Sequence, residues 1–479
     1  MVLANRRNYE TTDTGGVEAI PYNVIGTSAR FTYSYEDKYL AEANFGYNGS
    51  EQFAPNNRFG FFPAGSIGWV ASNENFLKDN PIVTWLKFRA SYGEVGNDSM
   101  GNLRFLYLDH MSASGGGTST GGLGGHTISE GKIGNKQIQW EVAHKYNLGF
   151  ELGLFKDLRL NVELFKENRD HILINRQTIP QFQGVPSGNI PAVNMGKVDN
   201  KGFEVELSYS HTFNKDYSFS VKGNFGYNKN KVIEYDEPMR TDDYAYRYRV
   251  EGFRLGQAWG YKIDWNSPGK GYFTSQEEID NYYPYAFGSP RVGDFVYKDI
   301  NGDQKIDDKD FSPIGYSTSI PGIVYGINLS ANIKGFDINV LFSGVGQYSK
   351  YFSGQGVIEY TKAGTFFEWT RHAWTQERWQ NGEKISYPAV STAQAVSHRQ
   401  NDFFIQNRAF MRLKNIEIGY TLPFRFLSKA GVKSLRIYAS GQNLYDWNHL
   451  RITHIDPEQN SNYGYPITKN VSVGVNVNF

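Results

Sequence analysis

The sequence of 479 residues has no cysteine, no excess of charge of either sign and no long hydrophobic run. Without cysteine, disulfide frameworks and thiolate metal sites are excluded. Basic and acidic side chains number 49 each, so the chain lacks the basic excess with which nucleic-acid-binding proteins neutralise phosphates. No run approaches the roughly 18 apolar residues of a membrane-spanning helix, and the mean hydropathy is -0.53. A transmembrane β-barrel is compatible with this composition, because its strands show lipid only every second residue.

Aromatic residues and glycine are abundant instead, with 33 Phe, 33 Tyr, 9 Trp and 51 Gly. This composition is typical of many strands joined by turns. In residues 471–479, four valines and Phe479 alternate with Ser, Gly and Asn, and the same period of two predicts a hairpin over 203–211 and 217–228. A soluble sandwich shows the same alternation, so this pattern alone does not separate the two architectures.

The alternation predicts thirteen strands: 28–35, 38–48, 60–72, 85–96, 142–155, 158–172, 202–211, 217–228, 323–333, 336–346, 404–422, 434–443 and 470–479. The connections between them alternate in length along the chain. The short ones are 36–37, 73–84, 156–157, 212–216, 334–335 and 423–433, and the others are 49–59, 97–141, 173–201, 229–322, 347–403 and 444–469. Outer-membrane barrels place short turns at the periplasmic end and long loops outside, whereas a sandwich has no reason to do so.

Thirteen is an odd number, and bacterial barrels of this kind close with an even number of strands. We therefore expect an odd number of strands to be missing. The first predicted strand runs from the long-loop side, so residues 1–27 are expected to be the remnant of an extracellular loop, and 28–479 the C-terminal part of the barrel. No signal peptide is recognisable near Arg6 and Arg7. The expectation is a C-terminal piece of a longer polypeptide.

Several motifs share a characteristic order and spacing over nearly the whole chain. They are Ala90–Asn97, Asn194–Gly202, Gly293-Asp294 with Asp299–Asp303, Tyr325–Leu329 with Lys334–Phe336, Met411–Ile416 with Leu422-Pro423, Gly441–Leu444, Asp456–Glu458 and the terminal Phe479. With these motifs the chain resembles the SusC/RagA family of TonB-dependent outer-membrane transporters.

The resemblance implies an all-β fold, a transmembrane antiparallel β-barrel of 22 strands with a plug in its lumen and long extracellular loops. About thirteen C-terminal strands would lie in this chain, and the N-terminal barrel and plug portion, with its TonB-contacting segment, would lie upstream. The resemblance also implies import of large nutrients, with oligosaccharides as the first choice of cargo and peptides as the second. It implies a SusD-like surface lipoprotein as partner and TonB as energy source. Outer-membrane lipid would surround the barrel. Two open strand edges would be costly in lipid, which supports the presence of the upstream portion in the native protein.

The segment Asp299–Asp310 has the ligand spacing of a Ca²⁺ loop, within the predicted extracellular loop 229–322. The candidate ligands are the side chains of Asp299, Asn301, Asp303, Asp307 and Asp310 and the carbonyl of Lys305. Gln304 stands where glycine is usual, and Asp310 is shorter than the usual bidentate Glu. The alternative is a solvated acidic turn. Bound Ca²⁺ would have a structural role, ordering the loop.

Three tryptophans, Trp369, Trp374 and Trp379, crowd the 347–403 loop together with Phe366 and Phe367. Their rings could stack on a sugar or peptide cargo. The competing interpretation, which we favour, is that they form the small core that a long loop needs.

Polar residues on the inward positions of the strands are expected to line the lumen, and Trp69, Tyr92, Tyr227 and Tyr420 to form interfacial girdles. The lumen candidates are Lys87, Arg89, Arg159, Glu163, Glu204, Glu206, Lys222, Asn224 and Glu417. No HExxH motif or nucleophile elbow is present, so no enzyme is predicted. A soluble or surface-attached β-rich glycan-binding protein and a passive porin remain as rivals to the importer.

Overall fold

The computed structural model describes residues 1–10, 19–101, 103–114, 127–238, 249–361, 366–423 and 431–479. The chain divides into two compact units. Unit 1 comprises residues 1–204, 229–239 and 250–252, and unit 2 comprises 205–228, 240–249 and 253–479. Each unit is described by itself.

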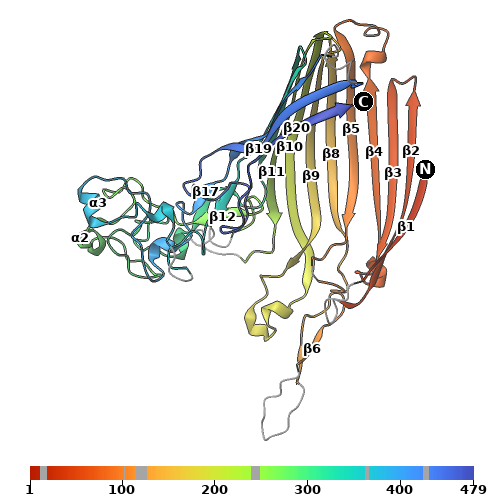
Figure 1. Cartoon of the computed structure of the whole chain (residues 1–479). Helices are drawn as coiled ribbons and strands as arrows, with labels where there is room; N and C mark the ends of the chain where they lie inside the picture. The colour runs from red at the N-terminus through yellow and green to blue at the C-terminus, as the bar shows by residue number, and fades with distance from the viewer. Residues whose placement is uncertain (11–18, 102, 115–126, 239–248, 362–365, 424–430) are drawn as a thin grey trace. The chain divides into compact units, whose positions relative to one another are not determined.

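The main sheet contains fourteen strands in the order β1-β2-β3-β4-β5-β8-β9-β10-β11-β14-β15-β18-β19-β20 (Figure 1). Their bounds are β1 Val2–Tyr9, β2 Tyr22–Tyr35, β3 Tyr39–Ser50, β4 Phe59–Val70, β5 Val83–Asn97, β8 Glu141–Leu154, β9 Leu158–Asn175, β10 Ala192–Asn214, β11 Tyr217–Glu234, β14 Ile323–Ile333, β15 Phe336–Gly346, β18 Phe410–Thr421, β19 Ser434–Asn448 and β20 Asn470–Asn478. Within each unit, neighbouring strands pair antiparallel. The strands thus form a meander in which sequence neighbours are also spatial neighbours.

Three short pairs of strands and a few short helices lie in the long connections. The pairs are β6 (Met111–Ser114) with β7 (Thr127–Glu130), β12 (Gln257–Gly260) with β13 (Ser312–Ser317), and β16 (Ser349–Tyr351) with β17 (Ile405–Asn407). The helices are α2 Gln276–Asp280 and α3 Gln376–Gln380, with 3-10 turns η2 Pro55–Asn57, η3 Ala71–Asn73, η4 Gln181–Gln183, η5 Ser187–Asn189, η7 Asp308–Asp310, η8 Glu368–Thr370 and η9 Val396–His398. In the described parts of the chain, no helix is long and apolar enough to cross a membrane.

All thirteen predicted strands are present in the main sheet, and the structure adds β1 before them. The prediction that residues 1–27 form a loop is therefore wrong, because Val2–Tyr9 pairs with β2 and β2 itself begins at Tyr22. The signal was hidden because Arg6 and Arg7 place a charge on both faces of β1. The main sheet has fourteen strands, so the predicted count of thirteen is also wrong. The inference that an odd number of strands is missing depended on that count and is wrong with it.

Two further boundaries differ from the prediction. Strand β10 begins at Ala192, ten residues before the predicted start, because its first half is polar on both faces and shows no period of two. The predicted strand 404–422 is split at Arg408 into β17 and β18, since β17 pairs with β16 whereas β18 pairs with β15.

One face of the main sheet is apolar and exposed. On β20 the side chains of Val471 and Val473 are 75% and 76% exposed, and the apolar side chains of β2 to β4, such as Phe31 and Ile67, are exposed as well. The buried clusters lie instead in the connections, one around Phe53 and Trp140 in unit 1 and one around Tyr297 in unit 2. The final strand is not tucked between two stacked layers, so the sandwich alternative is wrong.

Candidate functional site in the long connections

The long connections of unit 2 share one hydrophobic core, and we call this part the loop lobe. It comprises the described residues of 253–311, 352–404 and 449–469, which lie between β11 and β14, between β15 and β18, and between β19 and β20. Its core is rich in aromatic rings packed at edge and tilted angles, which adds to the free energy of burial. The fully buried members include Phe273, Phe295, Tyr297, Ile306, Phe352, Tyr387, Phe404 and Ile452. Three connections distant in sequence are therefore held as one folded body.

The structure places the tryptophans of the 347–403 loop in or against this core. Trp369 and Trp374 are only 8% and 6% exposed, and Trp379 packs against the cluster from its edge. The Trp369 ring centroid lies 4.7 Å from that of Tyr387. Of the two interpretations of these rings, the structure supports packing, because buried ring faces are not accessible to a cargo.

The motif Gly293-Asp294 is explained by this packing. Gly293 has φ +89°, a left-handed conformation, and a Cβ at this position would lie 2.4 Å from Cε3 of Trp374. Only glycine meets both conditions without a shift of the indole. Its neighbour Asp294 accepts hydrogen bonds from the backbone N–H of Arg291 at 2.9 Å and from the hydroxyl of Ser397 at 2.9 Å.

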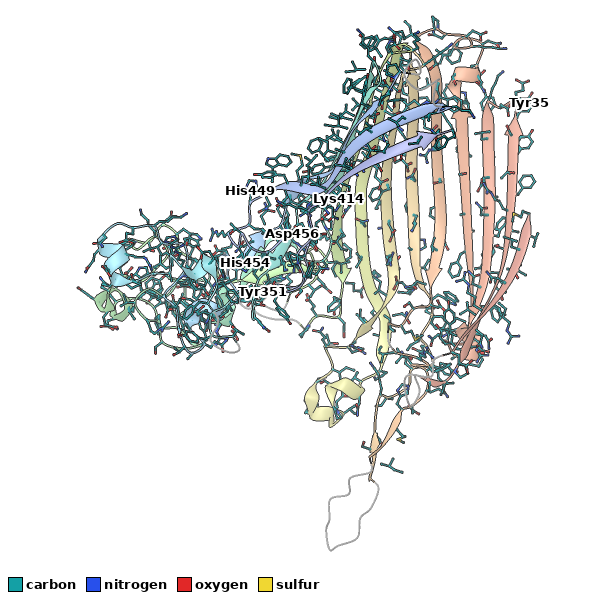
Figure 2. The ribbon with its side chains drawn as sticks, viewed as in Figure 1. Tyr35, Tyr351, Lys414, His449, His454 and Asp456 are labelled. Carbon is teal, nitrogen blue, oxygen red and sulfur yellow. The ribbon has the colours of Figure 1, made fainter. Side chains whose placement is uncertain are left out.

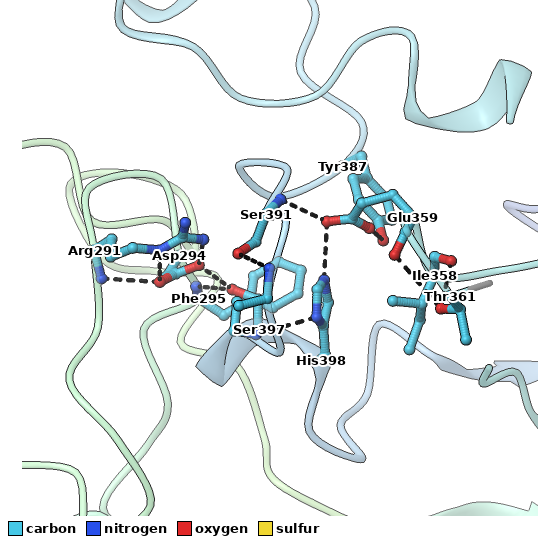
Figure 3. A network of polar contacts seen from close by, with 12 residues as sticks. Arg291, Asp294, Phe295, Ile358, Glu359, Thr361, Tyr387, Ser391, Ser397 and His398 are labelled. Atoms are coloured by element: carbon cyan, nitrogen blue, oxygen red, sulfur yellow. Dashed lines mark hydrogen bonds and ion pairs between the residues drawn. The ribbon is translucent and has the colours of Figure 1, made fainter. Parts of the chain in front are cut away.

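A buried polar network crosses the core of the loop lobe (Figure 3). Glu359 is 2% exposed and accepts hydrogen bonds from His398 Nε2 at 3.0 Å, from the Tyr387 hydroxyl at 2.5 Å and from the Ser391 backbone N–H at 2.9 Å. His398 Nδ1 accepts the backbone N–H of Ala395, so the ring proton lies on Nε2 and points to Glu359. Each polar group of this network thus has a partner, as buried polar groups require.

Electrostatics in the network follow from burial and partners. Burial would raise the pKa of Glu359, but the hydrogen bonds that it accepts from His398, Tyr387 and Ser391 hold this pKa below its usual range. Burial and the adjacent Glu359 carboxylate raise the pKa of Tyr387 well above that of free tyrosine. The group therefore contains a stable carboxylate, held by neutral donors. Nothing in the sequence pointed to it, because Glu359 and His398 are 39 residues apart without a periodic signal.

The predicted Ca²⁺ loop folds as a compact turn closed by its own side chains. Asp299 accepts the backbone N–H groups of Gly302 and Gln304 at 2.7 and 2.8 Å, and Asp310, which is fully buried, accepts those of Ile300 and Asp307 at 2.7 and 2.8 Å. Burial raises the pKa of Asp310, and the two N–H bonds only partly offset this.

The donors of this loop fit a calcium ion in part. Gln304, at the usual glycine position, adopts φ +64°, the left-handed conformation that a Ca²⁺ loop needs there. Asp303 and Asp307, however, face the ammonium groups of Lys309 and Lys305 at 3.7 and 3.1 Å. Among the described residues, no three acidic or histidine side chains converge as a metal site.

The motif Asp456–Glu458 holds the connection after β19 against β18. Arg412, only 2% exposed, donates through Nη2 to both carboxylate oxygens of Asp456 at 2.6 and 2.7 Å, and Lys414 lies 3.1 Å from Glu458 (Lys414 and Asp456 are labelled in Figure 2). The pattern Arg412–Lys414 of the neighbouring motif is the cationic half of this contact. Both motifs therefore hold the connection after β19 against β18.

Several of the residues predicted to line the lumen form ion pairs on the polar face of the sheet. Arg89 lies between Glu151 and Glu163, at 3.3 Å from Glu151, and Lys87 is 3.7 Å from Glu151. In unit 2, Arg436 binds Glu417 at 2.6 Å and also pairs with Asp337. The other candidates lie on the polar faces of β9, β10 and β11, as the alternation along these strands shows. They are Arg159, Glu204, Glu206, Lys222 and Asn224.

Exposed aromatic rings occur at positions that the sequence did not single out. Tyr463 and Tyr465, in the connection between β19 and β20, are strongly exposed, and so is Phe182 in unit 1. Their only signal in the sequence is an aromatic residue among small and polar neighbours.

The matching family model covers residues 4–312 and describes a TonB-dependent receptor-like β-barrel. The chain belongs to this family. One curated relative is TonB-dependent receptor P3 of Formosa agariphila. It is 27% identical to this chain over 514 residues, which cover 100% of this chain and 48% of that protein. TonB-dependent receptor SusC of Bacteroides thetaiotaomicron is 25% identical and covers 95% and 44%.

Solved structures give the same fold. The RagAB peptide importer in its open-open state aligns with a TM-score of 0.72 at 19% identity, over 96% of this chain and 47% of that one, and the RagAB peptide transporter aligns with 0.71. The chain spans about half the length of the relatives it matches. The SusC/RagA resemblance and the barrel-type fold are thus confirmed.

The buried carboxylate generates a testable prediction about the loop lobe. Because the pKa of Glu359 is lowered on folding, its ionised form stabilises the fold above about pH 4.3, and this stability is lost as the pH falls below that value. Glu359→Gln should lower the free energy of unfolding by about 1–3 kcal/mol at neutral pH and weaken the acid dependence. Tryptophan fluorescence during urea unfolding at several pH values measures both effects.

The exposed Glu368, paired with Arg371 at 3.1 Å, is the matched control. Glu368→Gln should leave the unfolding curve and its pH dependence almost unchanged, since exposed ion pairs contribute little. Equal effects of the two substitutions would contradict the assigned role of Glu359.

Proposed function

We propose that the chain forms part of the barrel of a TonB-dependent importer in the outer membrane, which takes up large nutrients together with a SusD-like surface lipoprotein. The observation that carries the proposal is the exposed apolar face of the main sheet, which in water would be a large unfavourable surface. In a bilayer the same face is satisfied by lipid. The opposite face, with its paired Arg, Lys and Glu side chains, then lines a wet lumen.

In this proposal the two ends of the strands have different tasks. The short turns face the periplasm, where TonB acts through the N-terminal plug portion of the same protein. The loop lobe faces outward and offers the contact surface to cargo and to the lipoprotein partner. Transport, rather than catalysis, is the activity, and energy from TonB displaces the plug after cargo is captured.

Oligosaccharides are the proposed cargo, with peptides as the alternative. Exposed aromatic faces at Tyr463 and Tyr465 support a ligand with an apolar C–H face, such as a sugar, because an aromatic ring covers apolar area at low entropic cost. RagAB, whose structures align with this chain, is a peptide transporter, which favours the alternative.

Growth tests distinguish the two cargo classes. A strain lacking the gene should lose growth on an oligosaccharide as sole carbon source, and Tyr465→Ala should slow this growth at low cargo concentration. Tyr283→Ala, an exposed tyrosine elsewhere in the loop lobe, is the control and should have no effect. Loss of growth on peptides alone would overturn the oligosaccharide proposal and leave the importer in place.

The membrane location predicts opposite responses on the two faces of β14. Ile327 lies on the exposed apolar face, and its neighbour Asn328 lies on the polar face, where it bonds Asn339 at 3.2 Å. Ile327→Lys should destabilise the protein in a bilayer by about 2–4 kcal/mol. Asn328→Lys should cost about 1 kcal/mol for the lost amide bond. Urea unfolding in lipid vesicles measures the difference.

The same experiment tests the location itself. The natural full-length protein should fractionate with outer membranes, need detergent for extraction and shift its gel mobility on heating. Monodisperse behaviour in plain buffer, with equal costs for the two lysine variants, would contradict a membrane barrel and favour a soluble binding protein.

We also propose that Ca²⁺ orders the Asp299–Asp310 loop. Support comes from the left-handed Gln304 and from the buried Asp310 carboxylate, which stands near the like charges of Asp299 and Asp307. A divalent cation would neutralise these charges in place of Lys305 and Lys309. The residues that would hold it are Asp299, Asn301, Asp303, Asp307, Asp310 and the Lys305 carbonyl.

Chelation tests this proposal. Ca²⁺ should slow proteolysis within residues 253–311 relative to EGTA, and Asp303→Asn should remove the protection, whereas Asp280→Asn in α2 should not. Gln304→Gly should stabilise the loop by about 1 kcal/mol, because glycine adopts a positive φ without the cost of a Cβ. Identical cleavage with and without Ca²⁺ would refute the metal site.

A further inference from the structure

A shallow apolar groove crosses the exposed face of β2, β3, β4, β5, β8 and β9, all in unit 1. Its volume of about 760 Å³ is within the range of roughly 300–1,000 Å³ that ligand sites occupy. Its floor and walls alternate between small and large apolar side chains. The groove residues used below are Phe31, Ala43, Gly65, Tyr92, Tyr146 and Leu164.

The strand registers place these residues in one continuous row. The partners are Phe31 with Ala43, Ala43 with Gly65, Gly65 with Tyr92, Tyr92 with Tyr146, and Tyr146 with Lys166. Aromatic rings stand at both sides of the small residues Ala43 and Gly65. The centroids of Tyr92 and Tyr146 are 5.0 Å apart, so these two rings form one wall.

The groove exists because Gly65 has no side chain. A Cβ built on Gly65 would meet only the carbonyl oxygen of Glu42, at 3.7 Å, so the space beyond it is open. Glycine inside a strand weakens the strand, and it often marks a place where a ligand approaches the backbone. A Cβ would fit here without a clash, so a close approach within the chain does not explain the glycine.

A cation stands at the end of the row. Lys166 is exposed, lies in the lining of the groove and forms no ion pair with any described residue. It lies eight residues beyond Leu158, about 27 Å along β9. At the usual tilt of about 35–45° this length corresponds to a rise of about 20 Å, which is near the far edge of the apolar band of about 25 Å. Since β9 runs from the short turn 155–157 toward the long connection 176–191, Lys166 lies at the outer-leaflet edge.

Polar groups continue outward from this edge. Tyr92 donates to Glu94 at 2.7 Å, and His144 lies 3.5 Å from Glu94 and 3.7 Å from Asp170. A cation suited to a phosphate thus neighbours carboxylates and an imidazole suited to hydroxyl groups. This combination favours a phosphorylated sugar headgroup over the simple phosphate of a glycerophospholipid.

We propose that the groove binds one lipopolysaccharide molecule of the outer leaflet, with an acyl chain on the Gly65 floor and a phosphate on Lys166. The proposal rests on the outer-membrane location proposed above. The site is separate from the loop lobe and from the polar face of the sheet, so it needs no cargo.

Native mass spectrometry of the natural full-length protein, extracted from outer membranes in mild detergent, tests the site. The wild type should retain one lipopolysaccharide. Gly65→Phe should abolish retention by filling the groove, and Lys166→Glu should reduce it about five-fold or more, as loss of one lysine contact to an anionic lipid implies.

Matched controls carry the same substitutions away from the groove. Gly223, on the apolar face of β11, is equally open, since a Cβ there would meet only the Gly326 carbonyl oxygen at 3.8 Å. Lys156 lies in the short turn of the same β8–β9 hairpin. Gly223→Phe and Lys156→Glu should retain the lipid, and heat-dependent gel mobility should show that all four variants are folded.

The outcomes separate this inference from the proposed function. A folded Gly65→Phe variant that retains lipopolysaccharide overturns the site, as does a wild type that retains only phospholipid, a second copy of the chain or nothing. In each case membrane extraction leaves the importer proposal standing. A protein found in the soluble fraction overturns both.

Discussion

The pairing of every strand with its sequence neighbour, in a sheet whose apolar face is exposed, is the constraint on which the rest of the structure depends. The ladder satisfies the backbone N–H and C=O groups within the sheet, so the strands need no second layer for hydrogen bonding. Their apolar side chains still need an apolar environment. In the proposed outer-membrane location a bilayer supplies it, and this one requirement accounts for the alternation and the strand lengths.

The connections follow the opposite rule, because water surrounds them. The loop lobe has its own aromatic core, around Tyr297 and Phe295, and it buries polar groups only where each finds a partner. Glu359 with His398, and Arg412 with Asp456, are such groups. Removing one partner of a buried pair is costly, so the first pair holds the connection between β15 and β18 together, and the second holds the connection after β19 against β18. A lobe with one shared core is what the proposed contact surface for cargo requires.

The alternation of apolar and polar residues along each strand predicted most of the sheet. The errors occur where this alternation is absent. Strands such as β20 and β14 were predictable because one of their faces must be apolar. Strand β1 was not predictable, because Arg6 lies on the same face as Val2 and interrupts the apolar pattern. Arg6 donates a hydrogen bond to Asn23 near the long-loop end of the sheet, where the side chains need not be apolar. The first half of β10 was missed for the same reason. The buried network was beyond prediction, because a contact between Glu359 and His398 depends on how two loop segments fold.

The row from Phe31 to Lys166 shows how sheet register converts sequence into a surface. Its first and last members are separated by 135 positions, and five successive registers bring them into line. A shift of one residue in any pair would turn the side chains of the following strand to the polar face. Buried faces normally hold register through packing, but in the proposed bilayer this apolar face meets only mobile lipid. The backbone ladder holds the register, and partly buried ion pairs on the polar face, such as Arg89 with Glu163, add to it from the other side of the sheet. Charges on the polar face thus contribute to the order of the side chains on the apolar face.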